Sequence, residues 1–339
     1  MELVRADLLS RARAGDETAF RALTEPHRRE LQVHCYRMLG SFHDAEEAIQ
    51  DTMLAAWRGL DKFDGRAALR TWLYRIATNQ CLDALRAVRR RPAKQWDVPG
   101  IDPPEPSRTN EVPWLEPYPD ALLDSAINVP LGPEARYEQT ESISLAFVTA
   151  LQVLPPRQLA VLILRDVLGF HADEVAKLLD TTVESVKSCL KRARDGMQRR
   201  LPADTSHKPP PMGNSSGEDA IVTKFVSAYE SADINALVAL LTDDVFVSMP
   251  PVTLEYHGRE VVGRFFDLVF RAVPNYALVR TRANGQPAFG IYRRSPTGLS
   301  AAGLFVLTLT GNKVRAITRF APAILPAFGL PPSFPHAPI

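Results

Sequence analysis

Apolar residues recur at helical spacing through most of the first 200 positions of the chain. The pattern predicts helices over residues 3–24, 27–39 and 44–59, and another over 67–91. One face of the last helix is apolar: Leu69, Trp72, Leu73, Ile76, Ala77 and Ala84. The other is made of cations and hydrogen-bonding groups: Thr71, Arg75, Thr78, Asn79 and Arg86. Such a face suits nucleic acid, because cations meet phosphates and amides meet bases; a solvated polar face is the alternative.

A second helical region follows between residues 134 and 201. Periodicity predicts helices over 137–153, 157–168, 173–179 and 183–201. The last of these turns an apolar stripe inward, and its outward face is polar and largely basic: Glu184, Ser185, Lys187, Ser188, Lys191 and Arg192. Helix, tight turn and helix with such a face predict a helix-turn-helix that reads the major groove. Thr182 is expected to cap the last helix.

The pattern changes again in residues 218–322. It predicts helices over 219–231, 235–241 and 258–273, and strands over 245–249, 276–283, 288–293, 299–310 and 313–320. This order predicts an α+β cone with a pocket. A catalytic pocket would need a base and an oxyanion donor. The candidates are Asp243, Asp244, Glu255, Tyr256, His257, Tyr276 and Tyr292, and the sequence leaves their arrangement open.

The composition of the stretches between these regions predicts that they are linkers. Residues 92–133 hold ten prolines and seven acidic against two basic side chains, which predicts an irregular acidic linker. It is either a passive tether or a nucleic-acid mimic whose carboxylates occupy a basic channel. Within it, the apolar and acidic stretch 114–120 is a candidate for docking. Residues 202–217 read as a second, flexible linker, and the Pro-rich tail from Pro322 as mobile.

Charge and cysteine content narrow the class of protein. A net charge of +1 gives no overall argument for a polyanionic partner, so the local charges carry that argument. Cys35, Cys81 and Cys189 are far apart and form no ligand pair or disulfide framework. With no apolar signal region and no membrane-length apolar run, we expect a soluble cytoplasmic protein that does not contact a membrane. We expect no metal and no cofactor.

The helix over 44–59 carries an acidic face formed by Asp44, Glu47 and Asp51, with Gln50 beside them. Three carboxylates on one face allow three interpretations: a solvated face, a metal site, or a docking face for a basic or polar helix of a partner.

The stretches DAEEAIQDTMLAAW, KFDG and RTWLYRIATNQCLDALR together resemble the second conserved region of extracytoplasmic-function (group 4) sigma factors of the bacterial sigma-70 family. The resemblance implies that Asp44, Glu47, Gln50 and Asp51 bind the RNA polymerase core enzyme. It also implies which residues take the melted strand of the −10 promoter element: Phe63, Arg66, Arg70, Trp72, Arg75, Asn79 and Arg86. For Trp72, a core position on the apolar stripe remains the competing interpretation.

The stretch from LPPRQLAVLILRDVLGF to EVAKLLDTTVESVKSCLKRAR resembles the fourth conserved region of the same family, which reads the −35 element. Asp180 stands where the turn usually has glycine, and Asp tolerates a left-handed backbone at some cost. Cys189 stands at a usual arginine position and cannot make a bidentate contact to guanine, so the promoter preference is expected to differ. The resemblance further implies that the acidic linker threads the polymerase near its active centre.

The order of elements in the third region, with its MPP and YHGRE segments, resembles SnoaL-like members of the nuclear-transport-factor-two superfamily. We therefore predict two all-α sigma domains (1–91 and 134–201) and a SnoaL-like α+β domain (218–322), with linkers at 92–133 and 202–217 and a tail at 323–339. The predicted function is promoter recognition with core polymerase, regulated by an intramolecular contact of the third domain. The alternatives are a helix-turn-helix regulator acting without polymerase and an isomerase- or cyclase-type enzyme.

Overall fold

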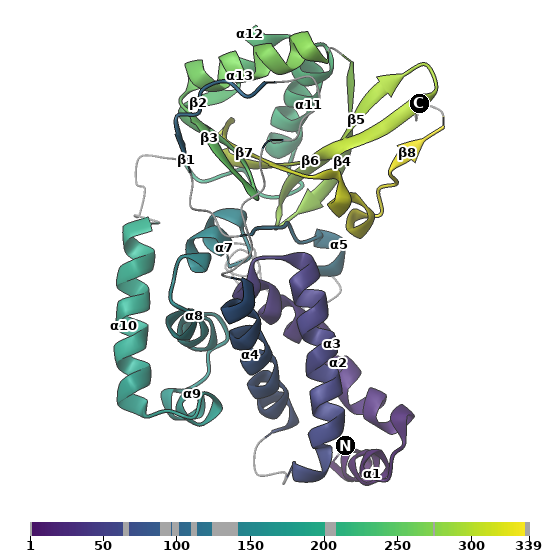
Figure 1. Cartoon of the computed structure of the whole chain (residues 1–339), viewed down its shortest axis with the longest axis vertical. Coiled ribbons are helices and arrows are strands. Elements are labelled where there is room, and N and C mark those ends of the chain that lie inside the picture. Colours follow the sequence, from purple (N-terminus) through teal and green to yellow (C-terminus); the bar gives the residue numbers. More distant parts are fainter. Residues whose placement is uncertain are drawn as a thin grey trace. The chain divides into compact units, whose positions relative to one another are not determined.

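The computed structural model describes residues 2–63, 68–88, 96, 102–109, 114–123, 142–200, 208–273 and 275–335 (Figure 1). The chain divides into two compact units. The first unit comprises Met1–Arg91 and Leu122–Pro202, and the second comprises Pro92–Ala121 and Ala203–Ile339. The second unit therefore takes in part of the stretch that composition marks as an irregular linker.

The first half of the first unit is helical. Its elements are α1 (Glu2–Arg13), α2 (Glu17–Leu39), α3 (Phe42–Gly59), a 3-10 turn (Leu60–Lys62) and α4 (Leu69–Val88). The prediction of one helix over 3–24 and a second over 27–39 is wrong. The chain breaks at Gly15, whose φ is +93°, and Asp16 caps α2 by accepting from the backbone of Thr18 and Ala19 at 2.9 and 3.0 Å. From there α2 continues through Pro26.

The core of this half lies between α2, α3 and α4, where large apolar side chains such as Leu31, Met38 and Leu73 are fully buried. Thr78, predicted on the polar face of α4, is buried instead. Its hydroxyl donates to the carbonyl of Tyr74 at 2.7 Å, so its oxygen accepts from Nε2 of His34 at 2.9 Å. That bond puts the imidazole proton on Nε2. Nδ1 of His34 has no hydrogen-bond partner among the described residues.

The second half of the first unit contains α7 (Leu145–Gln152), α8 (Pro156–Leu162), a π-helical turn (Ile163–Val167), α9 (Ala172–Leu178) and α10 (Val183–Arg200). The helix predicted over 137–153 begins at Leu145, after a turn over residues 142–144, while residues 137–141 lie outside the described part of the chain. Ala146, predicted to face inward, is exposed. The turn between α9 and α10 agrees with the predictions. Asp180 has φ +49°, and the Thr182 hydroxyl accepts from the backbone of Ser185 at 3.1 Å.

The second unit is an α+β cone, as predicted. Its helices are α11 (Ser216–Glu230), α12 (Ile234–Ala239) and α13 (Arg259–Ala272). Its main strands are β2 (Leu241–Met249), β3 (Val252–His257), β4 (Tyr276–Ala283), β5 (Gln286–Ser295), β6 (Gly298–Thr310) and β7 (Lys313–Phe320). The helices lie on one side of the curved sheet (Figure 1), whose order is β1-β3-β2-β7-β6-β5-β4, where β1 is the short strand Arg108–Thr109. β2 pairs with β7 in parallel, and the other neighbours along this path are antiparallel.

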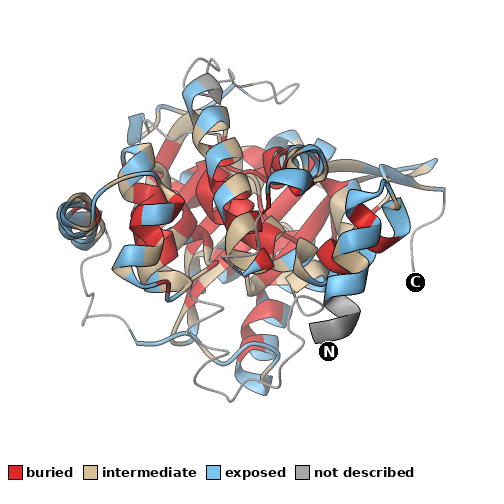
Figure 2. Ribbon diagram, turned by 90° about the horizontal axis from the view of Figure 1, so that it is seen from below, coloured by how far each residue is buried: buried red, intermediate tan, exposed pale blue. Residues whose placement is uncertain are grey.

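Aromatic side chains fill the space between these helices and the sheet. Phe225, Phe266 and Phe305 are buried around Tyr229, whose ring lies 5.3 Å from that of Phe305. Figure 2 shows the buried residues on inward faces, with exposed residues on the outer faces of the helices. Strand β3 was not predicted, because Pro250-Pro251 reads as the end of a strand. In the structure this pair makes the turn that returns the chain as β3.

Segments predicted to be irregular also join this unit. Strand β1 (Arg108–Thr109) pairs with β3, placing Arg108 opposite Glu255. The expectation of a mobile tail is wrong: a 3-10 helix (Pro322–Phe328) follows β7, and β8 (Ser333–Phe334) pairs with β6. The Tyr292 hydroxyl donates to the carbonyl of Pro331 at 2.8 Å, which ties the tail to the sheet. The short helix α5 (Asp120–Leu123) ends the described part of the first linker.

None of the helices in the described segments is long and apolar enough to cross a membrane. No group of three or more His, Cys, Asp or Glu side chains in the described ranges is arranged to hold a metal ion. The metal-site reading of the acidic face on α3 therefore has no support from its geometry.

Candidate nucleic-acid interface

The acidic face of α3 is smaller than predicted. Glu47, Gln50 and Asp51 are exposed, whereas Asp44 is only 9% exposed. Asp44 lies in the first turn of the helix, where its backbone donates to the Ser41 hydroxyl at 3.2 Å. The exposed part of the predicted docking face is therefore Glu47, Gln50 and Asp51, whereas Asp44 is buried at its edge.

The outward face of α4 presents three of the predicted DNA-binding residues. Arg75, Asn79 and Arg86 are exposed. Arg86 pairs with Asp83 one turn away at 2.5 Å, an exposed pair that contributes little to stability. This face offers two cations and an amide to a partner. Arg66 lies outside the described residues.

Arg70 makes contacts that join the two halves of the first unit. Its guanidinium pairs with Glu30 at 2.9 Å and lies 4.8 Å from the ring of Tyr74 and 5.7 Å from that of Phe170. Burial acts to raise the pKa of Glu30, but hydrogen bonds from His27 and Arg70 outweigh it and hold that pKa below its ordinary value. The Arg70 side chain remains 42% exposed. It is therefore a packing residue that is partly accessible to a ligand.

Phe63 and Trp72 form an aromatic pair at the start of α4. Their ring centroids are 5.0 Å apart, Phe63 is 7% exposed and Trp72 is half-buried. This contact supports a packing role for Trp72. Stacking of either ring on an unpaired base would require the pair to open.

The outward face of α10 carries the predicted helix-turn-helix contacts. Glu184, Lys187, Ser188, Lys191 and Arg192 are exposed, and Ser185 is half-buried. Lys187 is 3.7 Å from Glu184, and Arg192 donates to the Ser188 hydroxyl at 3.1 Å. These are local contacts along one helix, so the cations remain available to an external phosphate.

A cleft of about 280 Å³ lies between α4 and α10 within the first unit. Asn79 and Arg86 line it from α4, and Ser185 and Cys189 line it from α10. The structure thus brings together residues predicted to read two separate promoter elements. No local pattern predicted that these residues would lie together, since the two helices are far apart along the chain.

The apolar and acidic stretch 114–120 docks on the second unit. The backbone of Tyr118 donates to the Asn284 side chain at 2.8 Å, and Asp120 accepts from the backbone of Gly285 at 2.8 Å. Asp120 also pairs with Arg282 at 3.3 Å. Tyr118 is 1% exposed. The docking predicted as one option for this stretch is therefore present in the structure.

A second part of the linker lies along the edge of the sheet. Arg108 pairs with Glu255 at 2.6 Å, and the Glu255 side chain is 4% exposed. His257 lies 2.9 Å from the same carboxylate. The Tyr256 hydroxyl donates to the carbonyl of Pro104 at 3.0 Å, and burial raises the pKa of Tyr256 to about 12. Three of the candidate catalytic residues thus hold the linker.

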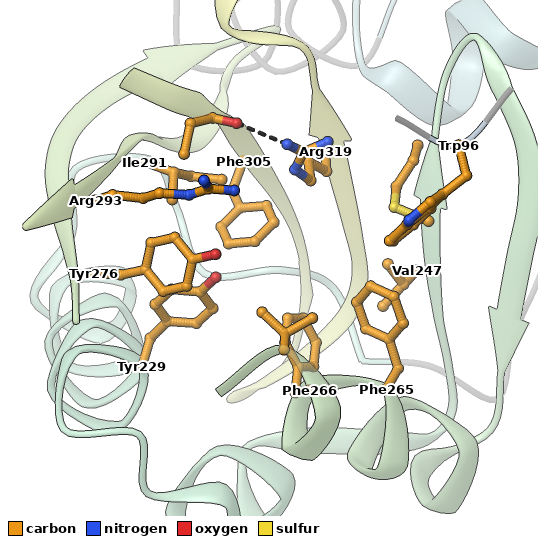
Figure 3. Close-up of a pocket in the computed structure, with 13 residues that line it drawn as sticks. Trp96, Tyr229, Val247, Phe265, Phe266, Tyr276, Ile291, Arg293, Phe305 and Arg319 are labelled. Atoms are coloured by element: carbon orange, nitrogen blue, oxygen red, sulfur yellow. Dashed lines mark hydrogen bonds between the residues drawn. The ribbon is translucent and has the colours of Figure 1, made fainter. Parts of the chain in front are cut away.

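The cone encloses a small cavity of about 30 Å³ (Figure 3). Of the candidate catalytic residues, only Tyr276 is among the described residues that line it. Asp243 and Asp244 are exposed and pair with Arg259 at 2.9 Å and Arg315 at 3.4 Å. Tyr292 reaches the tail. The candidate catalytic residues are therefore not gathered around this cavity.

Sequence reasoning missed the cavity's polar residues, Arg293 and Arg319, and its aromatic wall residue Trp96. Strand alternation could have found the arginines. Arg293 lies two positions after the buried Ile291, and Arg319 lies two after Ile317, so each pair points to one face. No pattern in the sequence indicated Trp96, because it stands in the proline-rich linker.

Comparison with known proteins adds family matches to this geometry. Residues 23–91 match the model of sigma-70 region 2, residues 144–195 that of sigma-70 region 4, and residues 222–317 that of the SnoaL-like domain. The ECF RNA polymerase sigma factor SigG of Mycobacterium tuberculosis is 41% identical over 329 residues, which cover 95% of this chain and 85% of SigG.

Other matches extend the comparison to shorter proteins and to solved structures. The ECF RNA polymerase sigma factor SigW of Bacillus subtilis is 27% identical over 201 residues, covering 59% of this chain and 98% of SigW. The crystal structure of the Mycobacterium tuberculosis extracytoplasmic function sigma factor SigJ aligns with a TM-score of 0.59 at 21% identity, covering 90% of this chain and 97% of that one. This structural likeness concerns the fold.

Proposed function

The chain belongs to the extracytoplasmic-function sigma factors of the sigma-70 family, and from this membership we propose that it acts in the cytoplasm as a dissociable promoter-recognition subunit of bacterial RNA polymerase. One observation carries the proposal beyond membership. A single helical unit presents an acidic face on α3, a cationic and amide-bearing face on α4, and a largely basic face on a capped helix-turn-helix. These are the surfaces that docking, strand capture and duplex reading require.

The helix-turn-helix is proposed to read the −35 element. Lys191 and Arg192 are exposed on α10 and can approach phosphates, which position a recognition helix in the major groove. Glu184, Ser185, Lys187 and Ser188 lie toward the beginning of the helix, the end that contacts base edges in this motif. Cys189 brings a thiol, so this position cannot supply the paired donors that recognise guanine.

The face of α4 is proposed to hold the melted strand of the −10 element. Unpaired bases need flat surfaces, and their backbone needs cations. Arg75, Asn79 and Arg86 offer the polar part of such a surface in an accessible form. Phe63 and Trp72 pack on each other, so stacking a base on either ring requires this pair to open, whereas Arg70 is 42% exposed and already partly accessible. The proposed docking face for core polymerase is Glu47, Gln50 and Asp51.

The second unit is proposed to regulate initiation by holding the acidic linker. Residues 102–109 and 114–120 are bound there by backbone pairing, by Arg108–Glu255 and by Asp120–Arg282. A linker held in this way is unavailable to a channel of the polymerase. The unit would then act through binding rather than through catalysis.

Run-off transcription tests the proposed function. The full chain and purified core polymerase would be incubated with a library of promoter fragments, and we expect transcripts that start at defined positions. Lys191→Ala combined with Arg192→Ala should reduce their yield by about tenfold or more, because phosphate contacts are lost. Arg199→Ala, an exposed cation at the far end of the same helix, is the matched control.

Two outcomes would contradict the proposal. One is the absence of any defined start site with core polymerase present. The other is specific binding to duplex DNA in a gel shift that core polymerase does not change, which would identify a helix-turn-helix regulator instead.

A further inference from the structure

The cavity of the second unit has an unusual balance of charge. Its walls are mostly apolar and aromatic, including Phe265, Phe266 and Phe305, yet Arg293 and Arg319 both reach it (Figure 3). Among the described residues that line it, no Asp, Glu or His is present. Cations in apolar surroundings are costly unless a negative charge or hydrogen bonds compensate them. The lining is therefore complementary to an anion.

The hydrogen bonds of the two arginines differ. Nη2 of Arg319 donates to the carbonyl of Ala302 at 2.7 Å, which fixes this guanidinium beside the cavity. Nε of Arg293 is buried and has no partner among the described residues. A buried donor left unpaired destabilises the protein, because its bond to water is lost and not replaced. A ligand acceptor at this position would replace that bond, so Arg293 marks where the anionic group belongs.

Two tyrosine hydroxyls point toward the same place. Figure 3 shows Tyr229 and Tyr276 directed toward the guanidinium groups, and their rings are 5.7 Å apart. Burial raises the pKa of Tyr229, so its hydroxyl stays protonated and can donate to an anion. Arginine and tyrosine donors together suit a carboxylate.

Trp96 limits the space that remains. Its indole comes from the linker, lines the cavity and meets Phe265 edge-on at 6.3 Å. With the indole in place, the cavity of about 30 Å³ holds little more than water. Any larger molecule must take the place of the indole, and a flat aromatic body would keep the edge-to-face contact with Phe265.

We propose that this cavity is a binding site for a small aromatic carboxylic acid, whose carboxylate meets Arg293 and whose ring displaces Trp96. Binding the acid and docking Trp96 are then mutually exclusive, so the acid favours release of this part of the linker. The regulatory consequence rests on the proposed function, whereas the binding site itself does not.

Calorimetric titration of the full chain tests the site without polymerase. The probe is indole-3-acetate, which carries an indole like that of Trp96 and adds a carboxylate, and indole-3-acetamide is its neutral match. We expect the acid to bind at least about tenfold more tightly than the amide, because hydrogen bonds to a charged group are stronger than those to a neutral one. Arg293→Met should weaken binding of the acid by a similar factor.

Matched variants separate a site from a nonspecific effect. Arg280→Met removes an exposed cation from the neighbouring strand β4, outside the cavity lining, and should leave the affinity unchanged. Trp96→Ala removes the competing indole and should tighten binding. Arg293→Lys keeps the charge but loses the forked donor geometry, so it should give an intermediate affinity and serves if the methionine variant fails to fold.

Displacement of the indole has its own measurement. In the full chain labelled with 5-fluorotryptophan, the fluorine NMR resonance of Trp96, identified by its absence in Trp96→Phe, should shift when the acid fills the site. Equal affinity for acid and amide, unchanged binding in both Arg293 variants, or no binding in Trp96→Ala would overturn the proposal. If the acid binds as expected but transcription is indifferent to it, the site stands and the regulatory role fails.

Discussion

His34 is a buried histidine held in one protonation state. Nε2 bonds to Thr78 and Nδ1 has no partner among the described residues. Burial, aided by the charges of Arg37 and Arg70, lowers the pKa of His34 to about 3. The folded first unit therefore contains His34 as the neutral imidazole, and protonation of this side chain destabilises the folded state.

Acid is expected to destabilise the first unit through this side chain. The pKa of His34 is lower in the folded state than the ordinary 6.5, so its contribution is complete above that value and is lost as pH falls toward about 3. At pH 5 the loss is about 2 kcal/mol. Urea unfolding at pH 7 and pH 5 measures it. In His34→Gln, which does not titrate, the difference in the free energy of unfolding between pH 7 and pH 5 should be smaller by that amount. An unchanged difference would contradict the lowered pKa of His34.

Asp180 is the second residue with a local consequence. Its φ of +49° is the left-handed conformation that glycine adopts without strain. Asp180→Gly should stabilise the helix-turn-helix by about 0.5–1 kcal/mol, and Asp180→Val should destabilise it by at least as much. Thermal unfolding of the two variants checks the ordering. If both variants melt below the parent chain, Asp180 has a role beyond its backbone conformation.

Residue roles were predictable where one local rule decides them. The cap at Thr182 and the strained Asp180 follow from turn chemistry. The burial of Asp44 and Thr78 does not follow from a local rule. Both residues lie at the border of the apolar face of their helix, where burial depends on which other elements pack against that border. The contacts of Arg70 with Phe170, a residue 100 positions later, lie beyond any local pattern.

At the scale of elements, α3 presents the acidic surface Glu47, Gln50 and Asp51 on a helix whose opposite side is packed in the core. A surface that is exposed on a rigid element can be changed without disturbing the fold. It is therefore the part of the first unit best suited to a direct test of docking to polymerase.

Asp51→Arg should weaken binding to core polymerase by about tenfold while leaving thermal unfolding unchanged, because it puts a cation on a face proposed to meet a basic or polar helix. Glu25→Arg reverses another exposed acidic charge, on α2, and is the control. Affinity would be measured by fluorescence anisotropy of the labelled chain. Equal losses in both variants would indicate a general charge effect, and no loss in Asp51→Arg would reject the docking face.

Most elements of both units were predictable from periodicity, including α3, α4 and α10 and the strands β4, β6 and β7 to within a few residues at their ends, whereas β2 was predicted only from Val245. The exceptions have physical causes. A loop with a capping aspartate divided one predicted helix, and a pair of prolines concealed the return of the chain as β3. The order of the described parts of the linker and tail was not predicted, because a proline-rich segment gains order only from the surface to which it binds.

At the scale of the whole molecule, the second unit is built from two separated stretches of sequence, since the linker supplies β1 to the sheet that residues after 203 complete. The linker's order therefore depends on the presence of the later stretch. This dependence can be measured without any assumption about polymerase.

Truncation after Leu201 should make the linker at Arg108 accessible to protease. In the full chain the backbone there pairs with β3, so cleavage by trypsin after Arg108 requires a local opening. We expect cleavage to become at least about tenfold faster in the truncated chain. Cleavage after the exposed Lys62, in the first unit, is the internal control. Equal rates at Arg108 in both chains would show that the second unit does not hold the linker.

The pairing of β1 with β3 also sets an order of events during synthesis. The ribosome makes residues 102–121 long before it makes β3, β7 and the tail strand β8, on which the finished sheet depends. At about 5–20 residues per second, translating the intervening stretch takes on the order of 10–40 s. A nascent chain therefore has its helical unit before the strands that bind the linker exist. Every molecule passes through a short period in which the linker is not held by the second unit.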